Sequence, residues 1–204
     1  MFYEPARGHG LPRDPFKALV APRPIGWFTT LNDDGSANVG PYSFFNAMAD
    51  DPPVVYFSSG GSDRVKDSVR NAVARGEFVH NLVTWDLKDQ MNATSEEVPA
   101  GVDEAKLAGL ELAPCRLVKT PRIAAAVASF ECRTMQTLEI PQNGENGPNT
   151  VVIGEVIGVH IRDEAIRDGR FDPEAQGVVA RLGYANYAVV GGTFRMLRPG
   201  IKAD

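Results

Sequence analysis

Two long stretches with strand character, at residues 130–140 and 150–161, constrain the fold of this chain more than any other feature of its sequence. In the first stretch, every second position falls on one face of an extended strand, so that Phe130, Cys132 and Leu138 point the same way. The connector between the two stretches, QNGENGPN, carries two Asn-Gly steps that are typical of turns. In the second stretch, Gly154 and Gly158 mark expected bends or bulges. The sequence therefore predicts two long strands separated by a turn.

Further strands are predicted around these two, and helices are few. The clearest helix is 63–75, because Ser62 is a suitable N-cap, Gly76 follows the C-terminal end, and Val69 and Ala72 share one face with Val65 and Val73. Weaker helix signals lie at 86–94 and 103–109. The remaining expected strands are 25–31, a return arm at 37–45 after the turn Asn32-Asp33-Asp34-Gly35, 53–58, 77–83 and a short last strand at 192–197. This pattern predicts a mainly β fold, a closed or half-open antiparallel barrel with a few connecting helices.

Length and charge exclude several classes of protein. A chain of 204 residues suggests one domain, in which residues 1–22 form an irregular, proline-rich N-terminal arm. The net charge of -5 argues against nucleic acid or an anionic membrane as the main partner. No apolar segment reaches the roughly 18 residues of a spanning helix, and the N-terminus lacks the apolar stretch of a signal peptide. Cys115 and Cys132 fit a reducing compartment, so we expect a cytoplasmic protein.

Common catalytic motifs are absent from the sequence, which contains no GxGxxG after a strand, no Walker A sequence and no GxSxG elbow. The histidines, His9, His80 and His160, are widely separated and lack the spacing of metal ligands. We therefore predict no metal site and interpret His80 and His160 as ordinary strand residues. Cys115 and Cys132 are interpreted as unreactive thiols, because no neighbouring residue in the sequence would lower a thiol pKa.

A candidate phosphate site follows the strand at 53–58. Serines and glycines lead from this strand into the predicted helix, whose first turn carries Arg64 and Lys66. A helix N-terminus presents free N–H groups and a partial positive charge that suit a phosphate, and a bound phosphate would offset the unfavourable placement of two cations there. The alternative is a capped loop with two solvated charges, which this segment by itself slightly favours. The candidate phosphate contacts are Ser58, Ser59, Arg64, Lys66 and Ser68.

Aromatic and polar side chains also mix at 27–30 and 42–46. Trp27 and Phe28 are adjacent on an expected strand, so they point to opposite faces. Such a mixture suits a flat heteroaromatic ring, with apolar contacts on its faces and hydrogen bonds at its edge. A hydrophobic hairpin in the wall of a barrel explains the same residues equally well.

Taken in order along the chain, several motifs resemble the flavin reductase-like family, which has the FMN-binding split-barrel fold. The resemblance extends from about Phe16 to Leu197 and includes Lys66-Asp67-Ser68, where the family commonly has Lys-Asp-Thr. It departs from the family at Tyr184, which stands where an Arg-Leu-Gly-Gly stretch has its second glycine, and mildly at His80. The other motifs are PRPIGW with Thr29-Thr30, NVGPYSFFN at 38–46, the segment 53–59, RN at 70–71, EFVHN at 77–81 and ARLG at 180–183 followed by Tyr187.

This resemblance implies a single flavin reductase-like domain over 1–204, folded as an antiparallel FMN-binding split β-barrel. It implies a homodimer with FMN near the subunit interface, and it agrees with the phosphate contacts named above. Arg181 and Tyr184 are implied to line the open face of the flavin. The implied ring contacts are Trp27, Thr29, Thr30, Ser43, Phe44, Phe45 and Asn46.

The function implied by the resemblance is that of an FMN-dependent flavin reductase, an oxidoreductase that transfers hydride from NAD(P)H to flavin. Flavin accepts hydride without a protein nucleophile, which agrees with the lack of a catalytic triad, and no catalytic residue is assigned. Two alternatives stay open: a non-catalytic FMN-binding electron-transfer protein, and a flavoprotein oxygenase acting on a small organic substrate. A separate monooxygenase component is considered as a partner.

Overall fold

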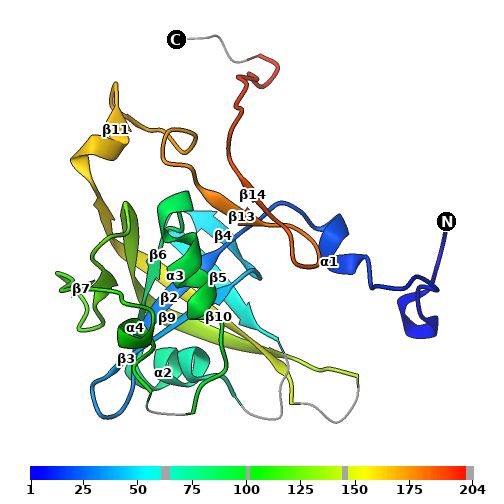
Figure 1. The fold of residues 1–204 in the computed structure, drawn as a ribbon, viewed down its shortest axis with the longest axis horizontal. Helices are drawn as coiled ribbons and strands as arrows, with labels where there is room; N and C mark the ends of the chain where they lie inside the picture. Colours follow the sequence, from blue (N-terminus) through cyan, green and yellow to red (C-terminus); the bar gives the residue numbers. More distant parts are fainter. Residues whose placement is uncertain (61–64, 100–101, 144–146, 201–204) are drawn as a thin grey trace.

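The computed structural model describes residues 1–60, 65–99, 102–143 and 147–200. Its main feature is a seven-stranded antiparallel sheet with the order β3-β2-β6-β9-β10-β5-β4 (Figure 1). The edge strands β3 and β4 are separated along the chain only by Ser43 and Phe44, so the sheet curls until its two edges approach each other. The predicted mainly β, antiparallel barrel is confirmed. The strands are β2 (Gly26–Leu31), β3 (Ala37–Tyr42), β4 (Phe45–Asp50), β5 (Pro53–Ser59), β6 (Glu77–Asn81), β9 (Ala128–Ile140) and β10 (Asn149–Ile161).

Short strands and helices surround this barrel. A second sheet joins β1 (Arg23–Pro24), β13 (Val179–Arg181) and β14 (Tyr187–Val189), and two small hairpins pair β7 (Leu112–Ala113) with β8 (Arg122–Ile123) and β11 (Ile166–Arg167) with β12 (Arg170–Phe171). The helices are η1 (Pro5–Arg7), α1 (Phe16–Leu19), α2 (Asp67–Arg75), η2 (Trp85–Leu87), α3 (Lys88–Ala93), α4 (Glu104–Leu107) and η3 (Asp163–Ala165). In the part of the chain that the structure describes, every helix is too short or too polar to cross a membrane.

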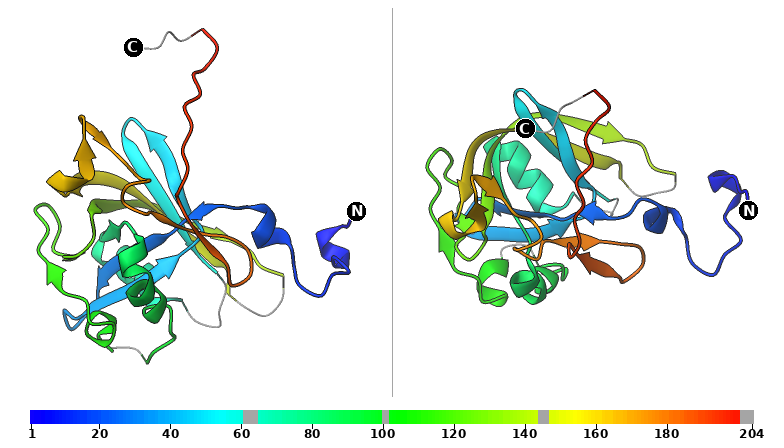
Figure 2. Two further views of the ribbon diagram at one scale, coloured as in Figure 1. Left: turned by 45° about the horizontal axis from the view of Figure 1, so that its top comes forward. Right: turned by 90° about the horizontal axis from the view of Figure 1, so that it is seen from above.

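The curved sheet buries apolar side chains on both of its faces, as the alternation along β2 predicts. Phe28 lies on the inner face, where its ring stacks on Phe57 with the centroids 4.3 Å apart. Helix α2 packs on the same side through Val69 and lies within the ring of strands when the barrel is seen from above (Figure 2, right). Trp27 lies on the outer face, where it packs in a second cluster that includes Met91 of α3. Both faces of β2 are therefore core.

Two predicted elements begin or end elsewhere. The return arm predicted over 37–45 is two strands, because β3 ends at Tyr42 and Phe45 already belongs to β4 at the opposite edge of the sheet. Helix α2 begins at Asp67 instead of residue 63, with Lys66 as an extended N-cap residue (φ -62°, ψ 145°). The proposed cap Ser62 lies outside the described residues. The end of this helix is as predicted, because Gly76 adopts the left-handed conformation at φ 70°.

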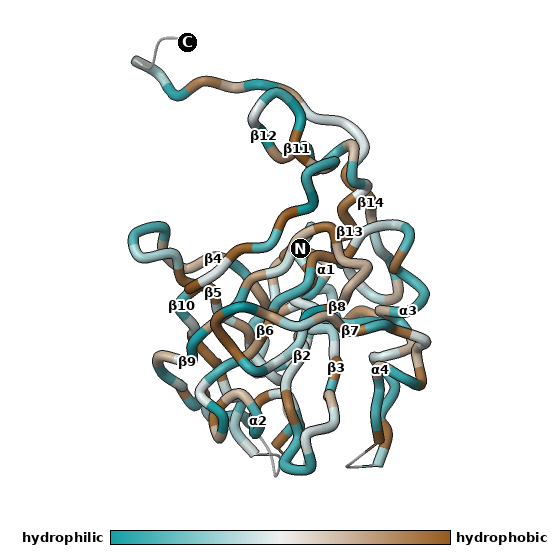
Figure 3. The backbone as a smooth tube through the Cα atoms, turned by 90° about the vertical axis from the view of Figure 1, so that its left-hand side faces the viewer, coloured by the Kyte–Doolittle hydropathy of each residue, from teal (hydrophilic) through white to brown (hydrophobic). Residues whose placement is uncertain are grey.

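Both ends of the chain lead away from the barrel (Figures 1 and 2). The arm at 1–22 is irregular as predicted, apart from the single turns η1 and α1. The short strand predicted at 192–197 is wrong, since these residues form no strand and the last strand of the described residues is β14. Hydrophobic segments continue into this tail (Figure 3), where Phe194 and Met196 are 82% and 79% exposed. These side chains have no place in the core of their own chain.

Candidate functional site

Two adjoining cavities lie where β3 leaves the barrel. The larger has a volume of about 590 Å³ and lies between the N-terminal arm, β3, α3 and the turn from β13 to β14. The smaller, of about 160 Å³, reaches the start of α2 and the residues that follow α3. Pro41 and Tyr42 of β3 and Ser95 after α3 line both cavities. The two cavities therefore share part of their walls.

A hydrogen-bonded network fixes the start of α2 at the smaller cavity. Asn38 of β3 donates from Nδ2 to the Ser68 hydroxyl at 2.8 Å and to the Thr30 hydroxyl at 3.1 Å. Asn71 also donates to Thr30, at 3.3 Å, so two strands and one helix share the same polar cluster. Gly40 lies beside this cluster, with its Cβ position 3.5 Å from the Ser68 oxygen. The network holds the Ser68 hydroxyl at the cavity wall.

Among the described residues, the lining of the smaller cavity is acidic. Its one described cation is Lys66, whose ammonium contacts the carboxylate of Glu97. Asp67 is paired with Arg70 at 2.7 Å. Glu104 accepts a hydrogen bond from the Val39 amide at 2.6 Å, and burial, together with the charges of Asp67 and Asp103, raises its pKa to about 7. A phosphate placed here would meet Lys66 and the Ser68 hydroxyl, and it would displace Glu97 from Lys66.

The larger cavity is basic and aromatic. Arg23 of β1 is only 6% exposed, and its guanidinium donates to the carbonyls of Lys17, Val20 and Leu182, the last at 2.8 Å. These bonds tie the N-terminal arm to the turn after β13. The same junction is tight at Gly183, where a Cβ would approach the Cβ of Ala18 to 2.3 Å. The arm is therefore a fixed wall of the cavity.

Beside Arg23, its register partner Arg181 on β13 lies over the ring of Tyr187, with 4.3 Å between the guanidinium carbon and the ring centroid. The guanidinium also donates to the carbonyl of Tyr184. Tyr184 has φ 57°, a left-handed conformation that glycine adopts most readily, so the backbone here keeps the shape expected of a glycine while presenting an aromatic side chain to the cavity.

Five of the site residues predicted from the sequence line these two cavities: Ser43, Arg181 and Tyr184 line the larger one, and Lys66 and Ser68 the smaller. Because the helix begins late, Lys66 precedes its first turn instead of lying in it. Arg64 lies outside the described residues.

Three other predicted residues, Trp27, Thr29 and Thr30, are completely buried in the wall of the barrel and line neither cavity. The indole of Trp27 donates to the Thr94 hydroxyl at 2.9 Å, and Thr29 accepts from Asn81 at 2.7 Å. These three residues are therefore part of the core. This agrees with the alternative explanation from the sequence, a hydrophobic hairpin in the wall of a barrel.

The remaining predicted residues lie around β4 and β5 and line neither cavity. Phe45 is buried in the inner core, whereas Asn46 is exposed. Phe44 is half-buried, with the Lys17 ammonium 5.8 Å from its ring centroid. Ser58 and Ser59 pair with Val151 and Thr150 of β10 at the end of β5.

Sequence reasoning missed Lys17, Arg23 and Tyr187 as cavity residues. Arg23 belongs to the family motif PRPIGW, but an arginine between two prolines has no periodic pattern that would show which way it faces. Lys17 lies in the arm, and its position depends on the long-range bond between Arg23 and Leu182. The residues of this cavity come from distant segments, so their proximity is a tertiary property.

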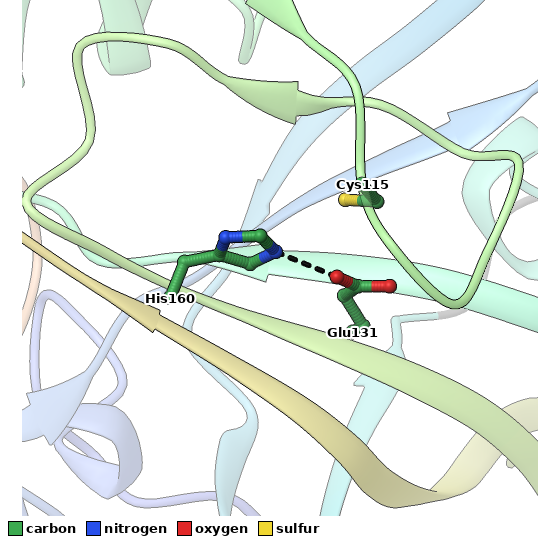
Figure 4. Close-up of side chains that lie close together, drawn as sticks. All are labelled: Cys115, Glu131 and His160. Atoms are coloured by element: carbon green, nitrogen blue, oxygen red, sulfur yellow. Dashed lines mark hydrogen bonds and ion pairs between the residues drawn. The ribbon is translucent and has the colours of Figure 1, made fainter.

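A separate cluster on the outside of the barrel brings together Cys115, Glu131 and His160 (Figure 4). The thiol sulfur, a carboxylate oxygen and a ring nitrogen lie within 4.8 Å of one another. Glu131 is buried and accepts hydrogen bonds from the backbone amides of Arg116, Leu117 and Val118 at 2.6–3.0 Å and from His160 Nε2 at 2.6 Å.

These four bonds fill the acceptor positions of the Glu131 carboxylate. Burial alone would raise the pKa of Glu131, but the backbone N–H groups and His160 outweigh it and lower the pKa. Burial and the nearby charge of Glu131 raise the pKa of Cys115 to about 12, which keeps this thiol protonated. We interpret the cluster as an anchor that fastens the loop at 114–120 to β9 and β10.

Comparison with known proteins finds a family model described as "Flavin reductase like domain", which matches residues 19–189. An uncharacterized protein of Deinococcus radiodurans is 40% identical over 81% of this chain and 74% of its own length. Among solved structures, nitrilotriacetate monooxygenase component B from Bacillus cereus is similar with a TM-score of 0.88 and 26% identity, covering 96% of this chain and 98% of that one.

Two further solved structures are similar to this chain. The 2-nitrobenzoate 2-nitroreductase NbaA of Pseudomonas fluorescens has a TM-score of 0.80 and 28% identity, covering 93% of this chain and 91% of that one. An FMN-binding protein from Thermus thermophilus has a TM-score of 0.71 and 15% identity over 93% of this chain and 97% of its own, a likeness in fold alone.

Proposed function

Because this chain belongs to the flavin reductase-like family, we propose that it binds FMN and transfers hydride from NAD(P)H to flavin. The family and its structural neighbours support a flavin-related oxidoreductase as the general function. The observation that carries the finer proposal is that the two cavities are neighbours and share Pro41, Tyr42 and Ser95 in their walls. Neighbouring cavities, of which one is aromatic and the other carries a lysine and a helix start, suit a ring with an anionic tail.

The residues at the smaller cavity fit the phosphate of FMN. No described side chain caps the N-terminus of helix α2, so the backbone N–H groups of its first turn suit an anion. The Ser68 hydroxyl and the Lys66 ammonium lie on the same wall and would donate to phosphate oxygens. Arg64, Ser58 and Ser59 remain proposed contacts from the segment that precedes this helix.

The residues at the larger cavity fit the flavin ring and the compound that reacts with it. Ser43 of the larger cavity and Tyr42, which lines both cavities, would contact the ring edge, and Arg181 and Tyr184 would line its open face. Bound FMN supplies the acceptance and release of electrons. The protein contributes binding, orientation and exclusion of water, which bring the reacting atoms into contact.

Two further proposals concern partners. We propose a homodimer with FMN near the subunit interface, which the exposed apolar side chains of the arm and the tail support. Delivery of reduced flavin to a separate monooxygenase is a second proposal, because the similar Bacillus cereus structure is named as component B of a monooxygenase.

The test is the absorption spectrum of the purified protein after incubation with FMN, followed by anaerobic addition of NADH or NADPH. We expect a flavin spectrum that bleaches with either nucleotide, and steady consumption of the nucleotide when free FMN is added in air. Bound flavin that is reduced by dithionite but by neither nucleotide would instead indicate an electron-transfer protein. Hydroxylation of an added organic substrate by this chain alone would indicate an oxygenase. A protein that binds no flavin would overturn the proposal.

A further inference from the structure

We propose that the larger cavity contains a subsite for a second anionic group, a carboxylate or a phosphate, formed by Lys17, Arg23 and Arg181. The proposal rests on the proposed function in one respect: the anion belongs to the compound that exchanges electrons with the flavin. It is distinct from the place proposed for the flavin phosphate, because Lys66 and Ser68 line the smaller cavity and these three cations line the larger one.

The first observation is the state of Arg23. Its side chain is more than nine-tenths buried, yet its Nε atom is buried with no hydrogen-bond partner among the described residues. The other nitrogen atoms bond only to backbone carbonyls, which satisfy N–H groups without neutralising the charge. A buried guanidinium is usually paired with a carboxylate, because desolvating an uncompensated charge is costly.

The second observation is that the cations of the cavity repel one another and lack counter-ions. Burial, and next the nearby charge of Arg181, lower the pKa of Arg23. None of the ion pairs in the described part of the chain includes Lys17, Arg23 or Arg181. The one acidic residue of the lining, Asp14, uses a carboxylate oxygen to accept from the Phe16 amide at 2.9 Å. An anionic ligand would remove this repulsion.

The third observation concerns the shape of the ligand. Tyr184 and Tyr187 line the cavity together with the cations, and Arg181 lies over the ring of Tyr187. Stacking on Tyr187 uses the face of the Arg181 guanidinium and leaves in-plane N–H groups for a carboxylate or phosphate. The combination of aromatic surface with two arginines suits a flat ring that carries a negative group.

The experiment measures the binding of benzoate and of its neutral analogue benzamide by calorimetry, first to the flavin-free protein and then to protein loaded with FMN. We expect benzoate to bind about ten- to a hundredfold more tightly than benzamide, as charge-assisted hydrogen bonds to a carboxylate predict. In Arg181→Gln and Lys17→Met this preference should fall to a few-fold. The matched control is Arg167→Gln in β11, an exposed arginine outside the cavity that should keep the full preference.

A competition with inorganic pyrophosphate separates the two sources of the anion. If pyrophosphate displaces benzoate and binds more tightly, the subsite takes the phosphates of a dinucleotide; if it does not compete, the subsite takes a carboxylate. Equal binding of benzoate and benzamide would overturn the proposal, as would a preference that survives both cavity substitutions. Loss of the preference on loading with FMN would also overturn it, because the flavin phosphate would then occupy the subsite. Since the first measurement needs no flavin, failure to bind FMN is recognised separately.

Discussion

At the scale of single residues, the structure separates side chains that hold the site from side chains that face it. The sequence predicts that Trp27 and Lys66 both contact the cofactor. In the structure, Trp27 is buried in the core, whereas Lys66 lines the smaller cavity. Lys66 is also held by the Glu97 carboxylate, so any anion that binds it must compete with an existing ion pair. This competition makes the role of Lys66 testable.

We expect Lys66→Met to weaken FMN binding about ten- to a hundredfold, because a charge-assisted contact with the phosphate is lost. Riboflavin, which has no phosphate, should bind the variant and the wild type alike. Glu97→Gln should strengthen FMN binding, since it releases Lys66. Fluorescence titration of both flavins measures these affinities, and Lys106→Met, an exposed lysine outside the cavity, is the control. Equal losses for FMN and riboflavin would place the phosphate elsewhere.

His80 predicts how stability depends on pH. Its ring is buried against Phe45, with the centroids 4.6 Å apart, and neither nitrogen has a hydrogen-bond partner in the described part of the chain. Burial lowers the pKa of His80 from 6.5 to about 4, and the backbone of Ile25 offsets only part of this shift. The unfolded chain therefore binds the proton more tightly. The contribution of His80 to stability is complete above about pH 6.5 and is lost as the pH falls towards about 4.

Urea unfolding at about pH 7.5 and about pH 4.5 tests this expectation. Protonation of His80 should remove about 2–3 kcal/mol of unfolding free energy between these values. His80→Phe should lack this part of the pH dependence, whatever its absolute stability, whereas His9→Phe should keep it. Parallel pH profiles for the wild type and His80→Phe would contradict the expectation, because carboxylates titrate in both proteins and cancel in the comparison.

At the scale of elements, the buried carboxylate of Glu131 and the half-buried carboxylate of Glu77 hold a loop on the barrel. Glu131 of β9 binds three successive amides at 116–118, and Glu77 of β6 binds the amide and hydroxyl of Thr120 at 2.7 Å and 2.9 Å. Gly158 of β10 makes room for this arrangement, because a Cβ there would lie 3.4 Å from Glu131 and 3.3 Å from Leu117. The loop is therefore held by side chains of the sheet.

We expect Glu131→Gln to release this loop. An amide group cannot accept at both ends, so buried N–H groups lose their partner, at a cost of about 1–3 kcal/mol each. Hydrogen exchange of the amides at 116–118 should accelerate strongly, while the amide of Thr120 is affected less. His160→Gln is the matched comparison, because it removes one of the four bonds and leaves the backbone contacts intact. Unchanged exchange in Glu131→Gln would show that the loop is held in another way.

At the scale of the whole molecule, the arm and the tail expose apolar side chains that the barrel does not cover. Phe2, Phe16 and Leu19 project from the arm, and Phe194 and Met196 from the tail. Burying such side chains against a second copy would stabilise a dimer by about 25 cal/mol for each Å² of apolar surface. The arm also forms a wall of the larger cavity, so assembly and the site are linked through the same segment.

We expect light scattering at micromolar concentration to give twice the chain mass of 22.1 kDa. Substituting Phe194 and Met196 together by Ser should shift the equilibrium towards the monomer, because both side chains lose apolar surface. The far-ultraviolet circular dichroism should stay unchanged, since neither residue packs in the core. A monomer mass for the wild type would contradict the homodimer.

The sequence determined the elements whose signal is local. Alternation and turn residues predicted β9 and β10, the opposite faces of Trp27 and Phe28 follow from the geometry of one strand, and Gly76 marked the end of α2 because its left-handed conformation favours glycine. The ordered family motifs then identified the fold and five of the residues that line the cavities.

Only the tertiary structure decided which of these faces is core and which is site. A strand pattern shows that Trp27 and Phe28 point apart, but not that both faces are covered, with Trp27 packed in the outer cluster and Phe28 in the inner one. The strand pattern alone would place Glu131 on an exposed face. In the structure, the loop at 114–120 covers it and buries its side chain. The cations Lys17, Arg23 and Arg181 come from distant segments of the chain. They line one cavity because β1 pairs with β13. Long-range pairing of this kind leaves no periodic trace in the sequence, because it depends on backbone contacts that nearly any residue can make.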